Sequence, residues 1–301
     1  MIPSLNYDSP AELRRFLESR KLGMRKMYGQ NFLINPAARK NLLDALEAGG
    51  GDAVWEIGPG IGAMTVGLLE RGALVTAFEI DRGFCAVLKE FFGASPGFKL
   101  IEGDALKTWP ETRAAGDYLF GNLPYNTGAA LLADFIERKR YFKRMVVTVQ
   151  KEVARRMAAK PGSKDYSSFS LLCASSYRVT LLPVLKGASF YPEPRVDSQG
   201  VRLDLVPGGE AASYPPCFFP LVRSLFSSRR KTVRNNLAAF IAESAARAGA
   251  AGAPAREIAE EALASAGING GERPERFGVE EFSALAGAVE KLLETGNRYG
   301  F

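Results

Sequence analysis

The chain has 301 residues, no histidine, three cysteines and a formal charge of +6. Without histidine it cannot supply an imidazole base, a histidine triad or a histidine metal ligand. The wide separation of Cys85, Cys173 and Cys217 argues against a disulfide framework and a cysteine-rich zinc site, so we expect no metal. Apolar runs are too short to span a membrane and no secretory signal is visible, so we expect a cytoplasmic protein that does not enter membranes.

Short apolar runs alternate with helix-like stretches through the first part of the chain. The runs cover 53–57, 74–78, 98–101, 118–120 and 145–149, and the helix-like stretches cover 36–48, 63–71, 82–92 and 128–138. This alternation is typical of β-α-β units, so we predict an α/β fold with a parallel, Rossmann-like sheet. Alternating apolar and polar residues predict a last, half-exposed strand at 201–206.

The pattern changes after residues 207–209, Pro-Gly-Gly, which are typical of a linker. Beyond them, helical spacing with many alanines recurs at 221–241, 255–266 and 279–293. We therefore predict two domains. Residues 1–208 form an α/β domain, of which 1–26 are an N-terminal extension, and residues 209–301 form a small helical domain.

A glycine-rich turn follows the first predicted strand. Its three glycines, within 58–62, let the backbone approach a ligand closely, and the next helix presents its amide-bearing end. The spacing also satisfies a dinucleotide fingerprint, with Glu79 where a ribose-binding acid is expected, so a nicotinamide dehydrogenase has to be weighed. Glu56 and Pro59 argue against a pyrophosphate, because one adds negative charge and the other lacks an amide N–H.

S-adenosyl-L-methionine suits this turn better, because it carries an amino group and a sulfonium where a dinucleotide carries phosphates. Nearby carboxylates then help to orient the ligand. Glu79 can accept hydrogen bonds from the two ribose hydroxyls, and Asp104, which follows the third predicted strand, from the adenine amine. The predicted cofactor is S-adenosyl-L-methionine, with S-adenosyl-L-homocysteine as its product.

A second motif, Gly-Asn-Leu-Pro-Tyr, occupies residues 121–125 after the fourth predicted strand. The amide oxygen of Asn122 and the carbonyl of Leu123 can both accept hydrogens from an exocyclic amine. Pro124 fixes the turn, and the ring of Tyr125 can stack on a base. Two acceptors would localise the lone pair of the amine towards a methyl donor, so no strong general base is required. The motif predicts methylation of an unstacked or single-stranded base.

Two stretches of the chain are strongly basic. Residues 137–164 contain ten Lys or Arg against two acids, and residues 211–242 contain no acid. The cations of the second stretch are Arg223, Arg229, Arg230, Lys231 and Arg234. Beside a base-binding motif, these cations predict contacts with RNA phosphates, with a solvated helix face as the alternative.

Together these motifs resemble the small-subunit ribosomal RNA adenine dimethyltransferases of the KsgA type. The resemblance runs almost from end to end of the chain. Its segments are 29–33 (GQNFL), 56–60 (EIGPG), 103–106 (GDAL), 121–125 (GNLPY), 160–166 (KPGSKDY), 190–198 (FYPEPRVDS), 229–236 (RRKTVRNN) and 273–276 (RPER). It implies an S-adenosylmethionine-dependent enzyme with a Rossmann-like domain and a helical C-terminal domain.

The resemblance also implies roles for single residues. It places Asn31, Leu33, Gly58, Glu79, Asp104 and Asn122 at the cofactor, and the glycine-rich turn adds Glu56 and Gly60. Tyr125 and Phe190 would hold the flipped adenine. The implied reaction is dimethylation of the N6 amines of two adjacent adenosines in a hairpin loop near the 3′ end of small-subunit ribosomal RNA. We expect a monomer acting on a pre-assembled small ribosomal subunit, with a role in its biogenesis.

Two alternatives stay open. A large-subunit ribosomal RNA methyltransferase of the antibiotic-resistance type would share the glycine turn and residues 122–125, although 190–198 and 229–234 favour the small subunit. A non-catalytic ribosome-assembly factor could retain the fold, although Asn122 and Tyr125 are intact in this chain. The resemblance implies no role for residues 1–26, which are longer than in a minimal family member.

Overall fold

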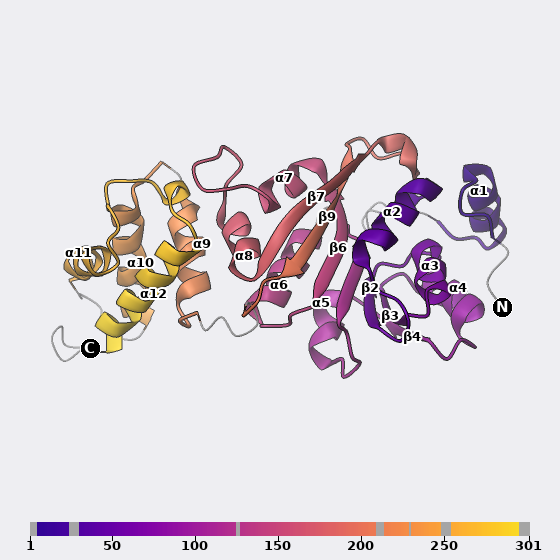
Figure 1. The fold of residues 1–301 in the computed structure, drawn as a ribbon, viewed down its shortest axis with the longest axis horizontal. Helices are drawn as coiled ribbons and strands as arrows, with labels where there is room; N and C mark the ends of the chain where they lie inside the picture. Colours follow the sequence, from indigo (N-terminus) through magenta and orange to yellow (C-terminus); the bar gives the residue numbers. More distant parts are fainter. Residues whose placement is uncertain are drawn as a thin grey trace. The chain divides into compact units, whose positions relative to one another are not determined.

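The computed structural model describes residues 5–23, 30–124, 127–208, 214–228, 230–247 and 254–294. The chain forms two compact units (Figure 1). The first contains Met1–Arg155 and Tyr177–Pro207, and the second contains Arg156–Ser176 and Gly208–Phe301. Residues 156–176 therefore group with the second unit, although they precede the boundary expected from the sequence.

Nine strands and twelve α-helices are found in the described ranges. The strands are β1 (Phe32–Leu33), β2 (Ala53–Ile57), β3 (Leu74–Glu79), β4 (Phe98–Glu102), β5 (Tyr118–Asn122), β6 (Arg144–Gln150), β7 (Tyr177–Leu185), β8 (Phe190–Tyr191) and β9 (Ser198–Leu205). The helices are α1 (Pro10–Ser19), α2 (Pro36–Leu46), α3 (Ala63–Glu70), α4 (Arg82–Phe92), α5 (Ala105–Thr108), α6 (Gly128–Glu137), α7 (Lys151–Met157), α8 (Ser168–Ser176), α9 (Phe218–Ser227), α10 (Val233–Arg247), α11 (Ala255–Ser265) and α12 (Val279–Glu294). Within these ranges, no helix is long and apolar enough to cross a membrane.

Seven strands form one mixed sheet in the order β4-β3-β2-β5-β6-β9-β7, which confirms the predicted α/β class. Strands β2 to β6 run parallel, and β9 is antiparallel to both β6 and β7. After β4 the chain returns to the other side of β2 to form β5, so the strand order reverses there. Ligands of open α/β sheets bind at such a reversal, beyond the carboxyl ends of the strands.

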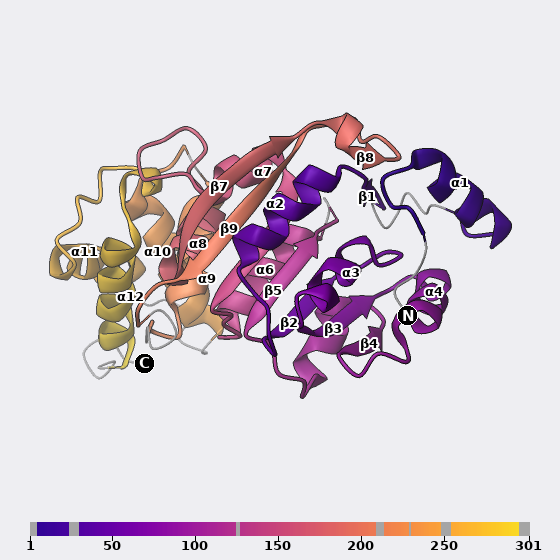
Figure 2. The ribbon, with the colours of Figure 1, turned by 45° about the vertical axis from the view of Figure 1, so that its right-hand side comes forward.

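Helices cover both faces of the sheet. On one face, Val54 of β2 and Phe120 of β5 pack in a common core with Leu43 of α2 and Leu68 of α3. Figure 2 shows α2 lying along β6 and β9, with which it is in contact. The opposite face carries a cluster of aromatic rings, formed by Trp55, Phe78, Trp109, Phe135 and Phe142.

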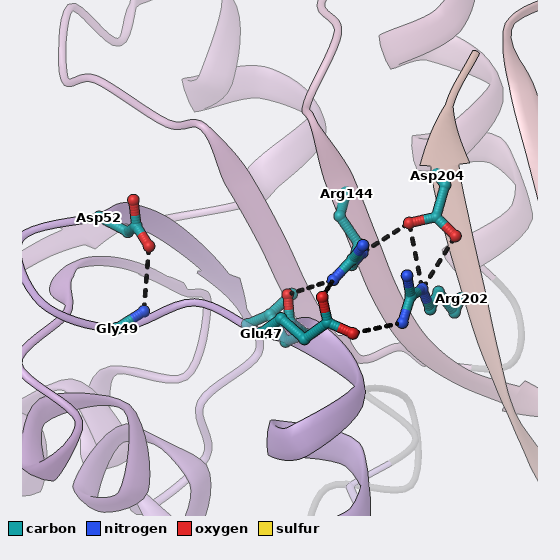
Figure 3. Close-up of polar contacts among 7 residues, drawn as sticks. Glu47, Gly49, Asp52, Arg144, Arg202 and Asp204 are labelled. Carbon is teal, nitrogen blue, oxygen red and sulfur yellow. Dashed lines mark hydrogen bonds and ion pairs between the residues drawn. The ribbon is translucent and has the colours of Figure 1, made fainter.

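Four charged side chains tie the end of α2 to the sheet (Figure 3). Arg144 of β6 contacts Asp204 of β9 at 2.6 Å and Glu47 at 2.5 Å. Arg202 bridges the same two carboxylates, at 2.8 Å each. Hydrogen bonds from Arg144 and Arg202 hold the pKa of Glu47 below its ordinary value. Because two guanidinium groups meet two carboxylates, the cluster is neutral and fixes where α2 ends.

Residues 5–23 fold onto the first unit. Ser9 caps α1 and Pro10 occupies its first turn, both favourable choices at a helix start. Leu13 and Leu17, one helical turn apart, are buried. They pack against an apolar group formed by Phe32, Ile61, Phe84 and Val87.

The second unit is helical, and its core explains why residues 156–176 belong to it. Tyr166 and Leu171 are buried in the same apolar core as side chains of α9 to α12, such as Leu225 and Leu285. The Tyr166 hydroxyl donates to the carbonyl of Phe277 at 3.0 Å. The segment from 156 to 176 therefore supplies core side chains that the other helices of this unit require.

The helical spacing at 221–241 belongs to two helices and not to one continuous stretch. Helix α9 ends at Ser227, and α10 begins at Val233. The side chain of Asn236 donates to the carbonyls of Leu225 and Ser228, at 2.8 and 3.2 Å. A buried side-chain amide thus satisfies carbonyls at the end of the preceding helix, which have no partner within it.

Candidate cofactor and base site

A cavity of about 180 Å³ lies at the carboxyl ends of β2 to β5 in the first unit. Its lining includes all eight residues expected at the cofactor: Asn31, Leu33, Glu56, Gly58, Gly60, Glu79, Asp104 and Asn122. These residues come from β1, from four parallel strands and from the turns that follow them. The reversal of strand order brings them to one edge of the sheet.

The turn after β2 leaves room for a ligand. Gly58 and Gly60 have φ values of 67° and 61°, in the left-handed region that favours glycine. A Cβ atom on Gly60 would stand only 2.9 Å from the ring of Phe32. A Cβ atom on Gly58 would meet nothing closer than the carbonyl oxygen of Asn122, at 4.0 Å. Gly60 thus allows the turn to pack on Phe32, and Gly58 keeps the cavity open.

Glu79 ends β3 and is 5% exposed. Its Oε2 accepts the amide of Gly60 at 3.1 Å, and its Oε1 accepts the amide of Asp81 at 2.8 Å. Burial raises the pKa of Glu79 to about 7, and the two backbone hydrogen bonds oppose the rise. Each oxygen retains a lone pair, so the carboxylate is a fixed acceptor for two hydroxyl groups.

Glu56 lies within β2 and is 1% exposed. Its Oε2 accepts the hydroxyl of Thr65, in α3, at 2.7 Å. Burial raises the pKa of Glu56 to about 8; the Thr65 hydrogen bond opposes this rise and the charge of Glu79 adds to it. A cation bound in the cavity would favour the ionised carboxylate and offset the cost of burying it.

The charges of the cavity discriminate between ligands. Glu56, Glu79 and Asp104 line it, whereas no Lys or Arg occurs among the described residues of its wall. Phosphates would be repelled there and would leave the carboxylates without a partner. The lining therefore disfavours a dinucleotide and fits a ligand that combines positive charge with hydroxyl groups.

Asp104 lies beyond β4 and begins a short helix. Its Oδ1 accepts the amide of Leu106 at 3.1 Å, which caps α5 and orients the carboxylate. Gly103, immediately before it, has a φ of 133°. This capped turn holds Asp104 at the cavity wall.

Asn122 is the last residue of β5, and its Nδ2 donates to the carbonyl of Asn31 at 2.8 Å. With the nitrogen engaged, Oδ1 is the atom available to accept an incoming amine hydrogen. The side chain of Leu123 is buried, so this residue can offer only main-chain groups to a ligand. Pro124 lines the cavity. Tyr125 lies outside the described residues, and its stacking role stays a prediction.

Phe190 is not brought to the cavity wall. It is 3% exposed and belongs to the apolar core that contains Leu43 and Val146. Strand β8 pairs with β1, so that Phe190 stands opposite Leu33, which does line the cavity. Its role in holding the adenine stays a prediction.

The cations expected to bind RNA lie in the second unit, where main-chain hydrogen bonds join three basic segments. The amides of Val233 and Arg234 donate to carbonyls within 270–272, at 2.9 and 3.1 Å. The amide of Gly162 donates to the carbonyl of Glu275 at 2.7 Å. The segments 160–166, 230–234 and 273–276, far apart in sequence, thus lie side by side.

Individual cations of this surface differ in availability. Arg223, Arg230 and Lys231 are exposed. Arg234 is partly exposed and stands 2.5 Å from Glu260, which offsets its charge. Arg229 lies outside the described residues. The adjoining segments add further exposed cations, namely Lys160, Lys164, Arg273 and Arg276.

Residues 22–261 match the family model described as ribosomal RNA adenine dimethylase. The chain belongs to this family. A protein from Treponema denticola, named ribosomal RNA small subunit methyltransferase A, is 44% identical over 243 residues, covering 78% of this chain and 82% of the relative. The protein of the same name from Treponema pallidum is 41% identical over 290 residues, covering 96% and 99%. The chain is therefore a methyltransferase of the ribosomal RNA adenine dimethylase family.

Solved structures share the fold. A dimethyladenosine transferase from Plasmodium falciparum superimposes with a TM-score of 0.71 at 24% identity, covering 87% of this chain and 97% of that one. The 23S rRNA methyltransferase ErmE gives a TM-score of 0.58 at 20% identity, covering 86% and 99%. At these identities the likeness shows that the Rossmann-like architecture is common to the group.

Several residues at the site of this adenine dimethylase were not expected from the sequence. Ile80 lines the cavity and is 40% exposed, although it is a large apolar residue. An apolar residue between two acids after a strand was the available signal, since an exposed apolar side chain offers a flat base a packing surface. Thr65 and Phe84 carried no such signal, because only the packing of α3 and α4 places them there.

Proposed function

We propose that this protein transfers methyl groups from S-adenosyl-L-methionine to the N6 amines of two adjacent adenosines in a hairpin loop near the 3′ end of small-subunit ribosomal RNA. One observation carries the proposal: the carboxylates of Glu56, Glu79 and Asp104 and the amide of Asn122 line one cavity where the strand order reverses. Family membership and the names of the Treponema relatives support the small subunit as substrate.

The residues of the cavity fit this cofactor. When bound, S-adenosyl-L-methionine supplies an electrophilic methyl group. Glu79 would accept the ribose hydroxyls and Asp104 the adenine amine, since both carboxylates are held in place by backbone amides. Glu56 would add negative charge close to a cationic ligand. Open space beside Gly58 admits the ligand to the turn.

Asn122 and Leu123 would hold the target amine. The hydrogen bond to Asn31 fixes the Asn122 amide, so that Oδ1 accepts one amine hydrogen, and the Leu123 carbonyl would accept the other. Holding both N–H bonds directs the lone pair away from the ring. Positioning then supplies most of the rate, and the proton that the amine loses can pass to water. A chain without histidine can perform this chemistry.

The second unit would bind the RNA. Its joined basic segments present cations to phosphates, and phosphate contacts position a protein on RNA without reading sequence. The partner is small-subunit ribosomal RNA within a pre-assembled subunit, where the enzyme acts as a cytoplasmic monomer during biogenesis. S-adenosyl-L-homocysteine is the product.

The test is incubation with labelled S-adenosyl-L-methionine and under-methylated small ribosomal subunits, followed by mapping of the modified nucleosides. Two neighbouring dimethylated adenosines near the 3′ end are expected. Large subunits and fully methylated small subunits serve as controls. Label confined to large-subunit RNA would support the antibiotic-resistance type of activity. No label in any RNA, with S-adenosyl-L-homocysteine bound, would favour a non-catalytic assembly factor.

A further inference from the structure

The N-terminal segment reaches the glycine-rich turn through one buried hydrogen bond. The hydroxyl of Tyr7 donates to the carbonyl of Ile61 at 2.9 Å. Tyr7 is 8% exposed and Ile61 is fully buried. Ile61 lies next to Gly60, whose amide is held by Glu79 and which lines the cavity. Tyr7 therefore holds the turn from outside the cavity wall.

The turn needs such support because its residues are conformationally free. Gly58, Gly60 and Gly62 all have φ values between 61° and 93°. Glycine loses more backbone freedom on ordering than any other residue, so a turn with three of them is easily displaced. A fixed carbonyl at Ile61 restricts the peptide units on both sides. The position of the Gly60 amide, and with it the orientation of Glu79, then depends on Tyr7.

Other contacts hold the N-terminal segment in place. Leu13 and Leu17 pack on Phe32 and Phe84, which themselves line the cavity. Asp8 pairs with Arg39 of α2. The segment is thereby part of the structure around the cavity rather than a solvated extension.

A further ion pair links Arg39 to the cavity wall, because its Nη1 donates to the carbonyl of Leu33 at 2.8 Å. Burial raises the pKa of Tyr7, with a further contribution from the charge of Glu56. The hydroxyl therefore keeps its proton and remains a donor throughout the neutral range. These contacts place Tyr7 close to two of the cavity's components, the turn and the buried carboxylate.

We propose that Tyr7 is a positioning residue for the cofactor: it fixes the Ile61 carbonyl and so holds the glycine-rich turn in the conformation that binds the nucleoside. This inference rests on the proposed function, because it assumes that the cavity binds S-adenosyl-L-methionine. It assigns residues 5–23 to the cofactor site.

The test is Tyr7→Phe, which keeps the buried ring and removes only the hydroxyl. Its dissociation constant for S-adenosyl-L-homocysteine, measured by calorimetry, and its KM for S-adenosyl-L-methionine should each rise about tenfold. The kcat should stay within about twofold, since no reacting atom is touched. Tyr177→Phe is the matched control: the Tyr177 hydroxyl is buried too and accepts the amide of Phe142 at 3.0 Å, away from the cavity. The control should lose thermal stability with unchanged cofactor affinity.

Hydrogen exchange of the wild-type protein gives a second measurement that needs no variant. If Tyr7 and the cofactor stabilise the same turn, then S-adenosyl-L-homocysteine should slow amide exchange around Leu13 and Leu17, because coupling between two sites is reciprocal. Unchanged cofactor affinity in Tyr7→Phe, or a fall in kcat alone, would overturn this inference and leave the proposed function standing. A wild-type protein that does not bind S-adenosyl-L-homocysteine would overturn both.

Discussion

Two buried carboxylates give the cofactor-free protein a characteristic dependence on pH. Glu56 and Glu79 have pKa values raised, chiefly by burial, to about 8 and about 7. Between the ordinary carboxyl pKa and these values, the folded protein keeps protons that the unfolded chain has lost. Raising the pH through this window therefore lowers stability, by roughly 1.4 kcal/mol for each unit of pKa difference. Below the window the effect is absent, and above pH 8 it is complete.

We expect Glu56→Gln to remove much of this dependence. Thermal unfolding of the cofactor-free protein between pH 5 and pH 9 measures it. The melting temperature of the wild type should fall towards pH 8, whereas that of Glu56→Gln should fall less and lie above the wild type at pH 8. Glu70→Gln, on the exposed surface of α3, should follow the wild type. Parallel curves for Glu56→Gln and the wild type would show that Glu56 is ionised in the folded protein.

Asn122→Ala separates chemistry from cofactor binding. It removes the side-chain acceptor for the target amine, so methyl transfer should be abolished in the subunit assay. The dissociation constant for S-adenosyl-L-homocysteine should stay within about tenfold of wild type, or roughly 1.4 kcal/mol. Asn41→Ala, exposed on α2, is the control and should retain both properties. Full activity of Asn122→Ala would refute the assigned role.

At the scale of single residues, the sequence predicted the polar groups of the cavity better than their supports. Glu79, Asp104 and Asn122 each end a strand or follow one, and the carboxyl ends of parallel strands meet at one edge, so spacing alone brought them together. Thr65 and Tyr7 act through contacts with residues distant in the chain. Only tertiary packing, which no local pattern encodes, sets such contacts.

Among the elements, the parallel strands were predicted and the edge strand β7 was not. Its run, Tyr177–Leu185, contains Pro183, and a proline lacks the N–H that a central strand requires. The structure accommodates it because β7 lies at the edge of the sheet and its register with β9 shifts between Leu181 and Val184. Strands β1 and β8 have two residues each, too few for a periodic pattern.

The break between α9 and α10 has the same origin as the basic surface. Arg230 and Lys231 lie between the two helices, where the chain turns towards the segment at 270–272. Apolar spacing continued across this break, so the sequence did not reveal it. The turn nevertheless exposes both cations.

Replacing Arg229, Arg230 and Lys231 together by alanine tests this surface. RNA binding should weaken, and the slope of its affinity against salt should become shallower by about two counterions, because each lost phosphate contact on single-stranded RNA accounts for roughly 0.7. Arg256→Ala combined with Lys291→Ala removes exposed cations from α11 and α12 and is the control. An unchanged slope in the triple variant would return the segment to a solvated surface.

For the whole molecule, the division into two units predicts separable losses. Leu171 lies in the core of the second unit and Leu68 in the core of the first, and both are fully buried. Each substitution by alanine should cost about 2–5 kcal/mol of stability. Leu171→Ala should weaken RNA binding with cofactor affinity within twofold of wild type, and Leu68→Ala should weaken cofactor binding. Calorimetry with S-adenosyl-L-homocysteine and RNA-binding titrations measure both. Loss of cofactor affinity in Leu171→Ala would contradict the division.

The path of the chain limits how this architecture can change. The backbone passes between the two units at 155/156, at 176/177 and again at 207/208. A recombination event at any one of these points would therefore leave a chimaera in which Tyr166 and Leu171 come from one parent and their core neighbours from the other. Exchange of the helical unit between relatives has to transfer the inner insertion and the C-terminal part together, or replace a matched set of interior side chains in both.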